Sequence, residues 1–396
     1  MPSYSPSPAR IFRYCGVSFL LGIVFASYTN NFALFLLLVG IGGVVSFLLS
    51  SNSKFNLVLL LIICSFIAGF FRYYLVGSSS SDSLSVPFLS SLAAPLREKV
   101  KLNLEKNLPF PEVYIAESLL LGHRNNMPQW LYQKFIQSGL AHLVAVSGLH
   151  LMIIVSVLNK IGKKLLLPFW LNYGIIAAII LLFVALADFS PSVVRAAIMA
   201  LILLMGQLAH RPYNSTNAII AAAVVMTFGN PNILKDSLGF QLSFLSCLGI
   251  IYLYPIIANY SFWKRPIFQK ELFMVKEAFL LSGSALIATA PWILYRTGHL
   301  SLVGLVTTIL VVPLLPYLMI GGVLIALLEF IFHWGAMVFA WWELIGLKYL
   351  FSLVNIFSTI PMLSGAFPGI LVMGYYTLLI YFIKKKQQTI EILPTK

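Results

Sequence analysis

Long apolar runs divided by short polar stretches constrain this chain more than any other feature. Of its 396 residues, 60% are hydrophobic and only 10% are charged. The apolar residues form repeated runs of about twenty, the length that crosses a bilayer as a helix. Because backbone polar groups in lipid must be satisfied within the chain, and barrel-type alternation is absent, these runs should be helices. The expected fold class is all-α, a polytopic integral membrane protein.

We predict about 11–12 transmembrane helices, one or more of them broken or re-entrant. Two prolines predict a break in the run 301–328, and the run 333–352 has the tryptophans and charges of an interfacial helix. If the run 333–352 lies flat on the membrane, the C-terminus changes sides. The candidate spans are residues 14–29, 32–50, 55–76, 139–159, 168–187, 192–209, 215–229, 238–258, 278–297, 301–328, 333–352 and 367–383.

The basic residues predict the orientation of these spans. If Arg10 and Arg13 are cytoplasmic, most other Lys and Arg clusters, including 384–386, fall on the same side. This is the distribution that the positive-inside rule describes, so we expect a cytoplasmic N-terminus. The net charge of +14 fits the same rule and would also suit a polyanionic partner.

Four segments follow from this pattern. Residues 1–76 form an N-terminal membrane hairpin plus a third span, 77–135 an extracytoplasmic linker with amphipathic helices, 136–385 a transmembrane core, and 386–396 a short cytoplasmic tail. Within the linker, the serine-rich stretch 77–83 has the composition of a flexible tether. An amphipathic helix from Pro95 should lie on the membrane surface, and a second helix, 112–121, should end at Gly122.

The segment GLAHLVAVSGLH, residues 139–150, places polar side chains inside an apolar run. Ser147 and His150 are three residues apart and share a helix face, while Gly148 favours a kink or a broken span that lines a cavity. His142 lies just before them. Packing and interhelical hydrogen bonding explain a single such residue, but three within nine residues favour a functional role.

Ser190 and Pro191 predict the start of the span 192–209, as an N-cap followed by a first-turn proline. Arg195 then lies in the first turn, where a cation opposes the helix dipole and needs a partner. Asp188 could supply it as a structural ion pair, or the arginine could face a passing phosphate. The residues leave both readings open.

The start of the span 238–258 carries Asp236, Gly239, Gln241 and Ser243. Gly239 and Ser243 have the spacing at which small residues let two helices approach closely. Gln241 is the functional candidate of this group, although interhelical hydrogen bonding is the simpler reading.

Several kinds of chemistry lack their motifs. No G-x-x-x-x-G-K-[ST] loop is present, so nucleotide hydrolysis by that route is not expected. The six histidines are scattered without metal-ligand spacing, and the three cysteines lie far apart in apolar runs. We therefore expect no catalytic residue, no metal, no other cofactor and no disulfide framework.

The run GLAHLVAVSGLHL (139–151) resembles the signature of the bacterial competence DNA-uptake channels, the ComEC-type proteins. Three further blocks agree in order: FSPSVVRAAIMA (189–200), the stretch 211–250, and ATAPWILYRTGHLSLVGLVTTILVVPLLP (288–316). The likeness covers about 90–385. The matching residues are His142, Ser147, Gly148 and His150 in the first block, Arg195 in the second, and Pro231, Asp236, Phe240, Gln241 and Ser243 in the third.

This resemblance implies an inner-membrane channel that imports single-stranded DNA during natural transformation, with these residues lining, packing or gating it. Gly239, Pro313 and Pro316 belong to the structural part of the motif. The implied partners are single-stranded DNA, membrane lipid, a separate DNA receptor, nuclease and cytoplasmic helicase or motor, and a second copy of the chain. The OB-like and metallo-β-lactamase-like domains of many members have no counterpart here, so DNA capture and nuclease activity would come from other polypeptides.

Two other functions fit some of the same residues. An intramembrane serine hydrolase would use Ser147 with His150 or His142, although a serine and a histidine three apart on one helix rarely align for proton transfer. A secondary transporter for a small anion would use broken helices and Arg195, but the chain has no inverted-repeat signal.

Overall fold

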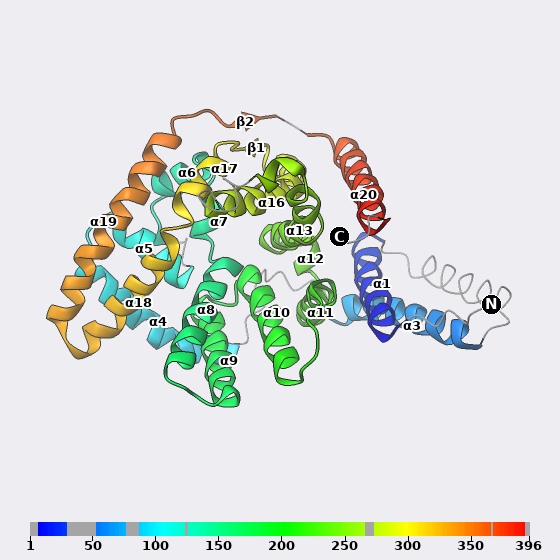
Figure 1. The fold of residues 1–396 in the computed structure, drawn as a ribbon, viewed down its shortest axis with the longest axis horizontal. Helices are drawn as coiled ribbons and strands as arrows, with labels where there is room; N and C mark the ends of the chain where they lie inside the picture. The colour runs from blue at the N-terminus through cyan, green and yellow to red at the C-terminus, as the bar shows by residue number, and fades with distance from the viewer. Residues whose placement is uncertain are drawn as a thin grey trace. The chain divides into compact units, whose positions relative to one another are not determined.

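The computed structural model describes residues 7–29, 53–76, 87–122, 126–265, 273–365 and 367–392. The predicted span 32–50 and the serine-rich stretch 77–83 lie outside these ranges. The described residues are almost entirely helical (Figure 1), which confirms the all-α class. A two-residue antiparallel pair, β1 (His299–Leu300) with β2 (Leu363–Ser364), is the sheet that they contain.

The chain divides into two compact units, each described here by itself. Unit 1 takes its residues from 1–85 and 194–241, and unit 2 from 86–193 and 242–396. The helices of unit 1 are α1 (Pro8–Tyr28), α3 (Ser53–Val76), most of α10 (Pro191–Leu208), α11 (Ser215–Gly229), α12 (Ile233–Asp236) and the start of α13 (Leu238–Tyr252).

Unit 2 contains the first residues of α10, most of α13, both strands and the remaining helices. They are α4 (Pro87–Asn107), α5 (Glu112–Leu121), α6 (Gln129–Gln137), α7 (Ala141–Val144), α8 (Gly148–Lys164), α9 (Phe169–Leu186), α14 (Tyr254–Ala258), the 3₁₀ turn η2 (Ser261–Lys264), α16 (Phe273–Thr297), α17 (Gly304–Val311), α18 (Leu315–Ile331), α19 (His333–Phe357) and α20 (Gly369–Ile392).

Seven described helices are long and apolar enough to cross a membrane, and one bent pair, α17 with α18, raises the number to eight. The seven are Pro8–Tyr28, Leu57–Val76, Phe169–Leu186, Pro191–Leu208, Leu238–Ala258, Val275–Thr297 and His333–Phe357. Each coincides with a predicted span to within a few residues. Helices α8, α11 and α20 overlap three more predicted spans, but α8 begins nine residues after the predicted start, α11 has only 15 residues, and none of the three is among the helices long and apolar enough to cross a membrane. The chain is a multi-pass membrane protein.

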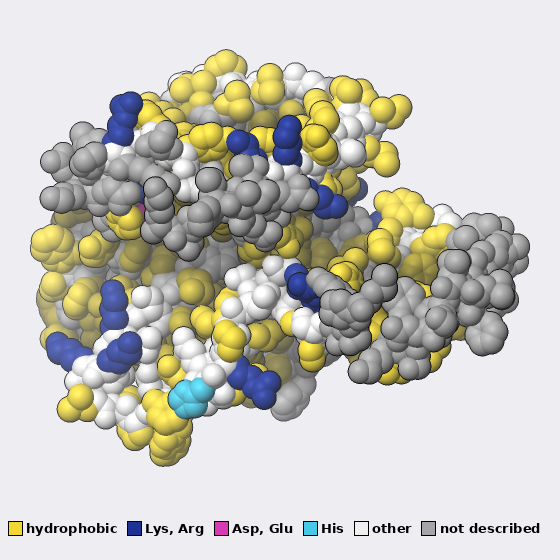
Figure 2. Space-filling view, turned by 45° about the vertical axis from the view of Figure 1, so that its right-hand side comes forward, with side chains coloured by type: hydrophobic (Ala, Val, Ile, Leu, Met, Phe, Trp, Pro, Cys, Tyr) yellow, Lys and Arg dark blue, Asp and Glu magenta, His cyan; other side chains and the backbone are white. Residues whose placement is uncertain are grey.

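The surface of the described residues matches this assignment. Apolar side chains cover much of the face in Figure 2, and the charged side chains visible there are almost all Lys or Arg. Exposed large side chains include Leu60, Leu181 and Trp342 on three of the long helices. Apolar surface of this extent is what lipid covers in a membrane protein.

The linker helices pack against protein rather than lying free. Helix α4 begins at Pro87, eight residues before the predicted start, and Pro95 lies inside it. Its second half buries Leu104 in the core of unit 2 together with residues of α5, α18 and α19, and Leu108, directly after the helix, is buried in the same core. The placement of this helix on the membrane surface stays a prediction. Helix α5 ends as predicted, with Gly122 in the left-handed conformation that favours glycine at a helix C-terminus.

Candidate functional site

The predicted span 139–159 is not one continuous helix. Helix α7 ends at Val144, residues 145–147 leave the helical conformation, and α8 begins at Gly148. Ser147 has extended backbone, with φ −115° and ψ 170°, and its N–H donates to His150 Nδ1 at 3.0 Å. This bond satisfies one of the N–H groups that a helix start leaves open. The break that Gly148 predicts is therefore confirmed, and Ser147 is the cap residue.

His150 is fully buried, and its two ring nitrogens have different surroundings. Nδ1 accepts from the Ser147 backbone, and the Ser147 hydroxyl lies 3.0 Å from the same nitrogen. A neutral ring that accepts at Nδ1 carries its proton at Nε2. Nε2 is buried without a hydrogen-bond partner among the described residues. Since an unpaired buried donor costs free energy, this position can take an acceptor from a ligand or water.

His142 does not join this pair in a hydrogen bond within the described structure. It is exposed on α7, and its Nδ1 lies 3.1 Å from the Gly139 carbonyl oxygen, in the preceding turn. The role of His142 as a lining residue stays a prediction.

The N-terminal end of the segment 139–164 is fixed to the start of the bent helix pair, α17 with α18. Gly139 has φ +76°, and a Cβ at Gly304 would meet the Gly139 backbone at 3.1 Å, so glycine is needed where the two backbones cross. Thr307 Oγ1 donates to Ser138 O at 2.8 Å, and Ser301 Oγ donates to Gln137 O at 2.7 Å. The first and fourth blocks of the resemblance are thus in direct contact.

The two prolines of the fourth block lie at the bend. Pro313 is in the turn between α17 and α18, and Pro316 is in the first turn of α18. The two helix axes differ by 56°. Because proline lacks the N–H that a continuous helix needs, it is tolerated in a turn or a first helical turn. The predicted proline break is confirmed.

Asp188 lies in a tight turn before α10. Asp188 and Phe189 both have positive φ, 50° and 53°, which is uncommon for residues other than glycine. Arg97 of α4 fixes this turn: its Nη2 donates to Ala185 O at 2.6 Å and lies 3.4 Å from Asp188 Oδ1. The sequence reading proposed Arg195 as the partner of Asp188 and missed Arg97.

Pro191 starts α10 as predicted, and Arg195 in its first turn is buried, with 8% of its surface exposed. Ser190 precedes the helix, but its hydroxyl makes no hydrogen bond within the described structure, so the predicted side-chain cap is not formed. Whether Arg195 faces a phosphate stays a prediction.

Gln241 stabilises a turn of unit 1. Its side-chain amide donates to Leu234 O at 3.0 Å and to Lys235 O at 2.8 Å, the carbonyls of the short helix α12. Pro231 is buried just before α12, Asp236 ends it, and Phe240 is buried in the first turn of α13. These bonds are local rather than between long helices.

The close helix approach predicted at Gly239 lies elsewhere. A Cβ at Gly239 would meet, among described atoms, only Ser237 Oγ at 3.9 Å, whereas one at Gly249 would collide with α16 at Ser284 O. Ser243 is buried on α13. The small-residue contact is therefore formed ten residues, nearly three turns, further along the same helix.

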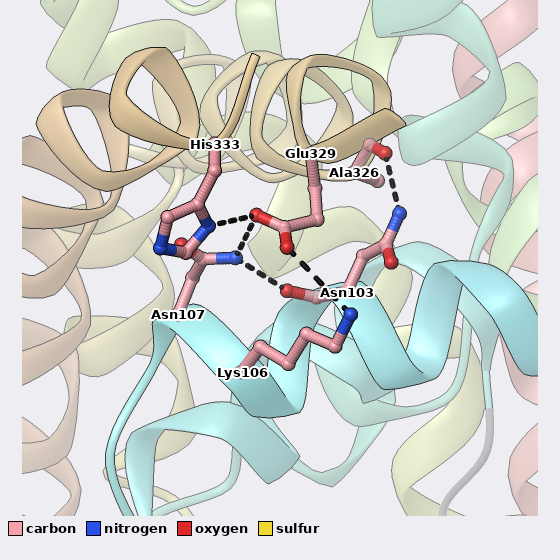
Figure 3. Close-up of polar contacts among 6 residues, drawn as sticks. All are labelled: Asn103, Lys106, Asn107, Ala326, Glu329 and His333. Atoms are coloured by element: carbon pink, nitrogen blue, oxygen red, sulfur yellow. Dashed lines mark hydrogen bonds and ion pairs between the residues drawn. The ribbon is translucent and has the colours of Figure 1, made fainter. Parts of the chain in front are cut away.

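Unit 2 also contains a polar cluster around the buried side chain of Glu329, which the sequence reading missed (Figure 3). Glu329 of α18 is 8% exposed, and its Oε2 accepts from Asn107 Nδ2 at 2.9 Å and from His333 Nδ1 at 2.8 Å. Lys106 Nζ lies 3.7 Å from Oε1, and Asn103 Nδ2 donates to Ala326 O at 3.0 Å. The spacing of Asn103 and Asn107, one turn apart on α4, was the available signal.

A second buried carboxyl group, Glu117 of α5, is different. It is 1% exposed, and neither carboxyl oxygen has a partner at ordinary hydrogen-bond geometry among the described residues. The Asn126 side chain is near enough to lower the pKa of this group, but less than burial raises it. Burial, and then the negative charge of Glu105, raise the pKa of Glu117 to about 7. The sequence offered no sign of this, because the residue reads as an ordinary polar position on a short helix.

Comparison with known proteins places this geometry in a family. ComE operon protein 3 of Bacillus subtilis is 26% identical over 292 residues, 70% of this chain and 36% of that protein. Recombination protein 2 of Haemophilus influenzae is 26% identical over 277 residues, 67% of this chain and 34% of that protein. The chain thus spans about a third of the length of these curated relatives.

No solved structure matches the chain. The sequence profile of the competence proteins matches residues 119–389, more than half of the chain. That range includes the break between α7 and α8, the bent helix pair and the Asp188 turn, and it confirms the resemblance that the four blocks indicated. This chain belongs to the competence protein family.

Proposed function

We propose that this chain forms the membrane path through which single-stranded DNA is imported during natural transformation. The observation that carries the proposal is the break at residues 145–147, which separates α7 from α8 and is held by Ser147 and the buried His150, in a member of the competence family. Non-helical backbone at membrane depth is tolerated where it is enclosed by protein or lines a cavity. A channel for a charged polymer needs polar groups of this kind along its path through the membrane.

The proposal includes an orientation and partners. The N-terminus is cytoplasmic, the membrane is the bacterial inner membrane, and lipid surrounds the long helices. We further propose that a separate helicase or motor drives the strand and that a separate receptor and nuclease prepare it. A second copy of the chain could complete the path.

Deleting the gene in a naturally competent host tests this function. We expect uptake of labelled DNA and transformation to fall to background and to return when the intact gene is supplied. His150→Phe keeps an aromatic ring of similar size but removes both nitrogens, so we expect strongly reduced uptake with normal protein levels. Unchanged transformation in the deletion strain would contradict the proposal.

One contact favours a second candidate, an intramembrane serine hydrolase. Ser147 Oγ lies 3.0 Å from His150 Nδ1, because Ser147 is a cap residue with extended backbone rather than part of the helix. A hydroxyl at this distance from a basic nitrogen is the pairing that activates a serine nucleophile. A hydrolase predicts labelling of Ser147 by a fluorophosphonate probe and loss of function in Ser147→Ala. The channel predicts no labelling, little effect of Ser147→Ala, and loss with bulky Ser147→Phe.

A further inference from the structure

Four aromatic side chains and one lysine form a cluster on unit 2, which we name the lysine–aromatic patch. Trp130 of α6 lies at its centre, with ring centroids 6.2 Å from Phe110 and 6.5 Å from Phe351 of α19. Tyr114 of α5 stands edge to face with Phe110 at 5.8 Å. Phe110 and Trp130 are 62% and 44% exposed. The patch therefore offers aromatic surface that the fold itself does not cover.

Lys134 is held against these rings. Its Nζ lies 5.4 Å from the Trp130 ring centroid and 6.0 Å from that of Phe351, and it donates to Asn355 Oδ1 at 2.7 Å. The described residues provide no carboxylate within ion-pair distance of this ammonium. One of its three N–H donors is used. Lys134 is thus a positioned, half-buried cation without a neutralising acid.

The surroundings add positive rather than negative charge. Lys348 of α19 is exposed and lies one turn before Phe351 and two turns before Asn355, on the same helix face. The acidic residue nearest to Phe110 in sequence, Glu112, is buried. A ligand that fits this surface combines negative charge with flat rings.

We propose that the lysine–aromatic patch binds single-stranded nucleic acid, with bases on Trp130 and Phe110 and a phosphate on Lys134. Aromatic rings stack on any base, and a neighbouring cation takes the backbone phosphate, so binding does not depend on base sequence. The inference rests on the proposed function and deepens it by naming residues that hold the strand before it enters the membrane path.

The competing occupant of such a surface is the lipid headgroup region, where Trp and Tyr also collect. Two observations favour nucleic acid. Helices α5 and α6, which carry Tyr114, Trp130 and Lys134, are not among those apolar enough to cross a membrane, and α19 contributes only the last two turns of its span, with Phe351 and Asn355. Moreover, interfacial lysines extend away from apolar surface toward water, whereas Lys134 is fixed on the rings by Asn355.

The test is the binding of a fluorescein-labelled dT20 oligonucleotide, followed by anisotropy, to the full chain in nanodiscs. We expect Trp130→Ala and Phe110→Ala to weaken binding about fivefold or more, the effect of losing one stacked base. Trp130→Phe and Lys134→Arg should retain most of it. Trp170→Ala is the matched control, because Trp170 is a 64% exposed tryptophan of unit 2 outside the patch.

Salt dependence separates the charge from the rings. For a single strand, each phosphate contact contributes about −0.7 to the slope of log Kobs against log salt concentration. Lys134→Gln should make the slope about 0.7 less negative, whereas Trp130→Ala should leave the slope unchanged while weakening binding.

Three results would overturn the patch proposal. The first two are no binding of the oligonucleotide by the intact chain and equal binding by the intact chain and the variants. The third is quenching of Trp130 fluorescence by brominated lipid, measured as the quenching that is lost in Trp130→Phe. The transformation assay of the deletion strain judges the proposed function separately. A strain that needs the gene for uptake, with patch variants that bind normally, refutes the patch alone.

Discussion

Glu329 and Glu117 are both buried carboxyl groups of unit 2, and their surroundings are opposite. Glu329 accepts hydrogen bonds from Asn107 and His333 and lies near Lys106 (Figure 3). Glu117 has no partner at ordinary hydrogen-bond geometry among the described residues, and the nearby Asn126 and Lys101 lower its pKa less than burial raises it. Lys101 itself lies between Glu98 and Glu105, at 3.8 and 3.9 Å. The same side chain is therefore compensated in one place and not in the other.

The difference indicates two roles. A buried carboxylate with several donors joins the elements that supply them, and here it joins α4 to the α18–α19 turn. A buried carboxyl group without donors costs stability once it ionises. Residues that lower folding stability in this way are found mostly at functional positions. The two sites should therefore respond to substitution with opposite signs.

The largest effect is expected at the compensated site. Glu329→Ala removes the acceptor of two hydrogen bonds and leaves the Asn107 amide less well paired, so we expect a loss of about 3 kcal/mol in unfolding free energy. The measurement is thermal unfolding of the purified protein in detergent, followed by far-ultraviolet circular dichroism. Glu329→Gln, which retains one carbonyl acceptor, should lose less. Equal stability of Glu329→Ala and the unsubstituted chain would show that the cluster does not join these helices.

At Glu117 we expect substitution to raise, rather than lower, the unfolding free energy at high pH. The pKa of Glu117 is about 7 in the folded chain and near the ordinary glutamate value when unfolded. The folded state therefore holds the proton more tightly. The stability from this proton is fully present below about pH 4.3 and is lost as the pH rises through about 7.

Glu117→Gln stays neutral at every pH, so it should be more stable than the unsubstituted chain at pH 8, by about 2 kcal/mol, and equally stable near pH 4. Melting midpoints at both pH values measure this. Glu105→Gln is the control for the neighbouring charge: it should make the loss at high pH smaller without removing it. A Glu117→Gln variant that is less stable at pH 8 would show that the carboxylate has a partner.

The long elements of the fold were predictable because lipid imposes a simple rule on them. Runs such as 168–187 and 192–209 are apolar over one bilayer thickness, and they appear as α9 and α10 with nearly the same ends. Breaks were predictable where the residue itself forbids a helix, as at Pro313. The packing of α4 was not predictable from the sequence, because an apolar helix face fits a protein core and a membrane surface equally well.

The candidate site was predictable in composition but not in pairing. Ser147 and His150 are close in the chain, so their contact follows from local geometry. By contrast, Arg97 meets Asp188 across 91 residues, and Asn107 meets Glu329 across 222. Charge and spacing show that such groups need partners, but only the tertiary contacts decide which partner each group obtains.

The smallest effect is expected at His333, and it sharpens the contrast between the two carboxyl groups. The ring donates to Glu329 but its side chain is 58% exposed, so water can replace much of what it supplies. We expect His333→Ala to lower the unfolding free energy by about 1 kcal/mol, the net value of one hydrogen bond. In the double variant with Glu329→Ala this loss should disappear, because the acceptor is gone. A double-mutant cycle measures the coupling. Additive losses would mean that His333 stabilises the turn through other contacts and that Asn107 alone compensates Glu329.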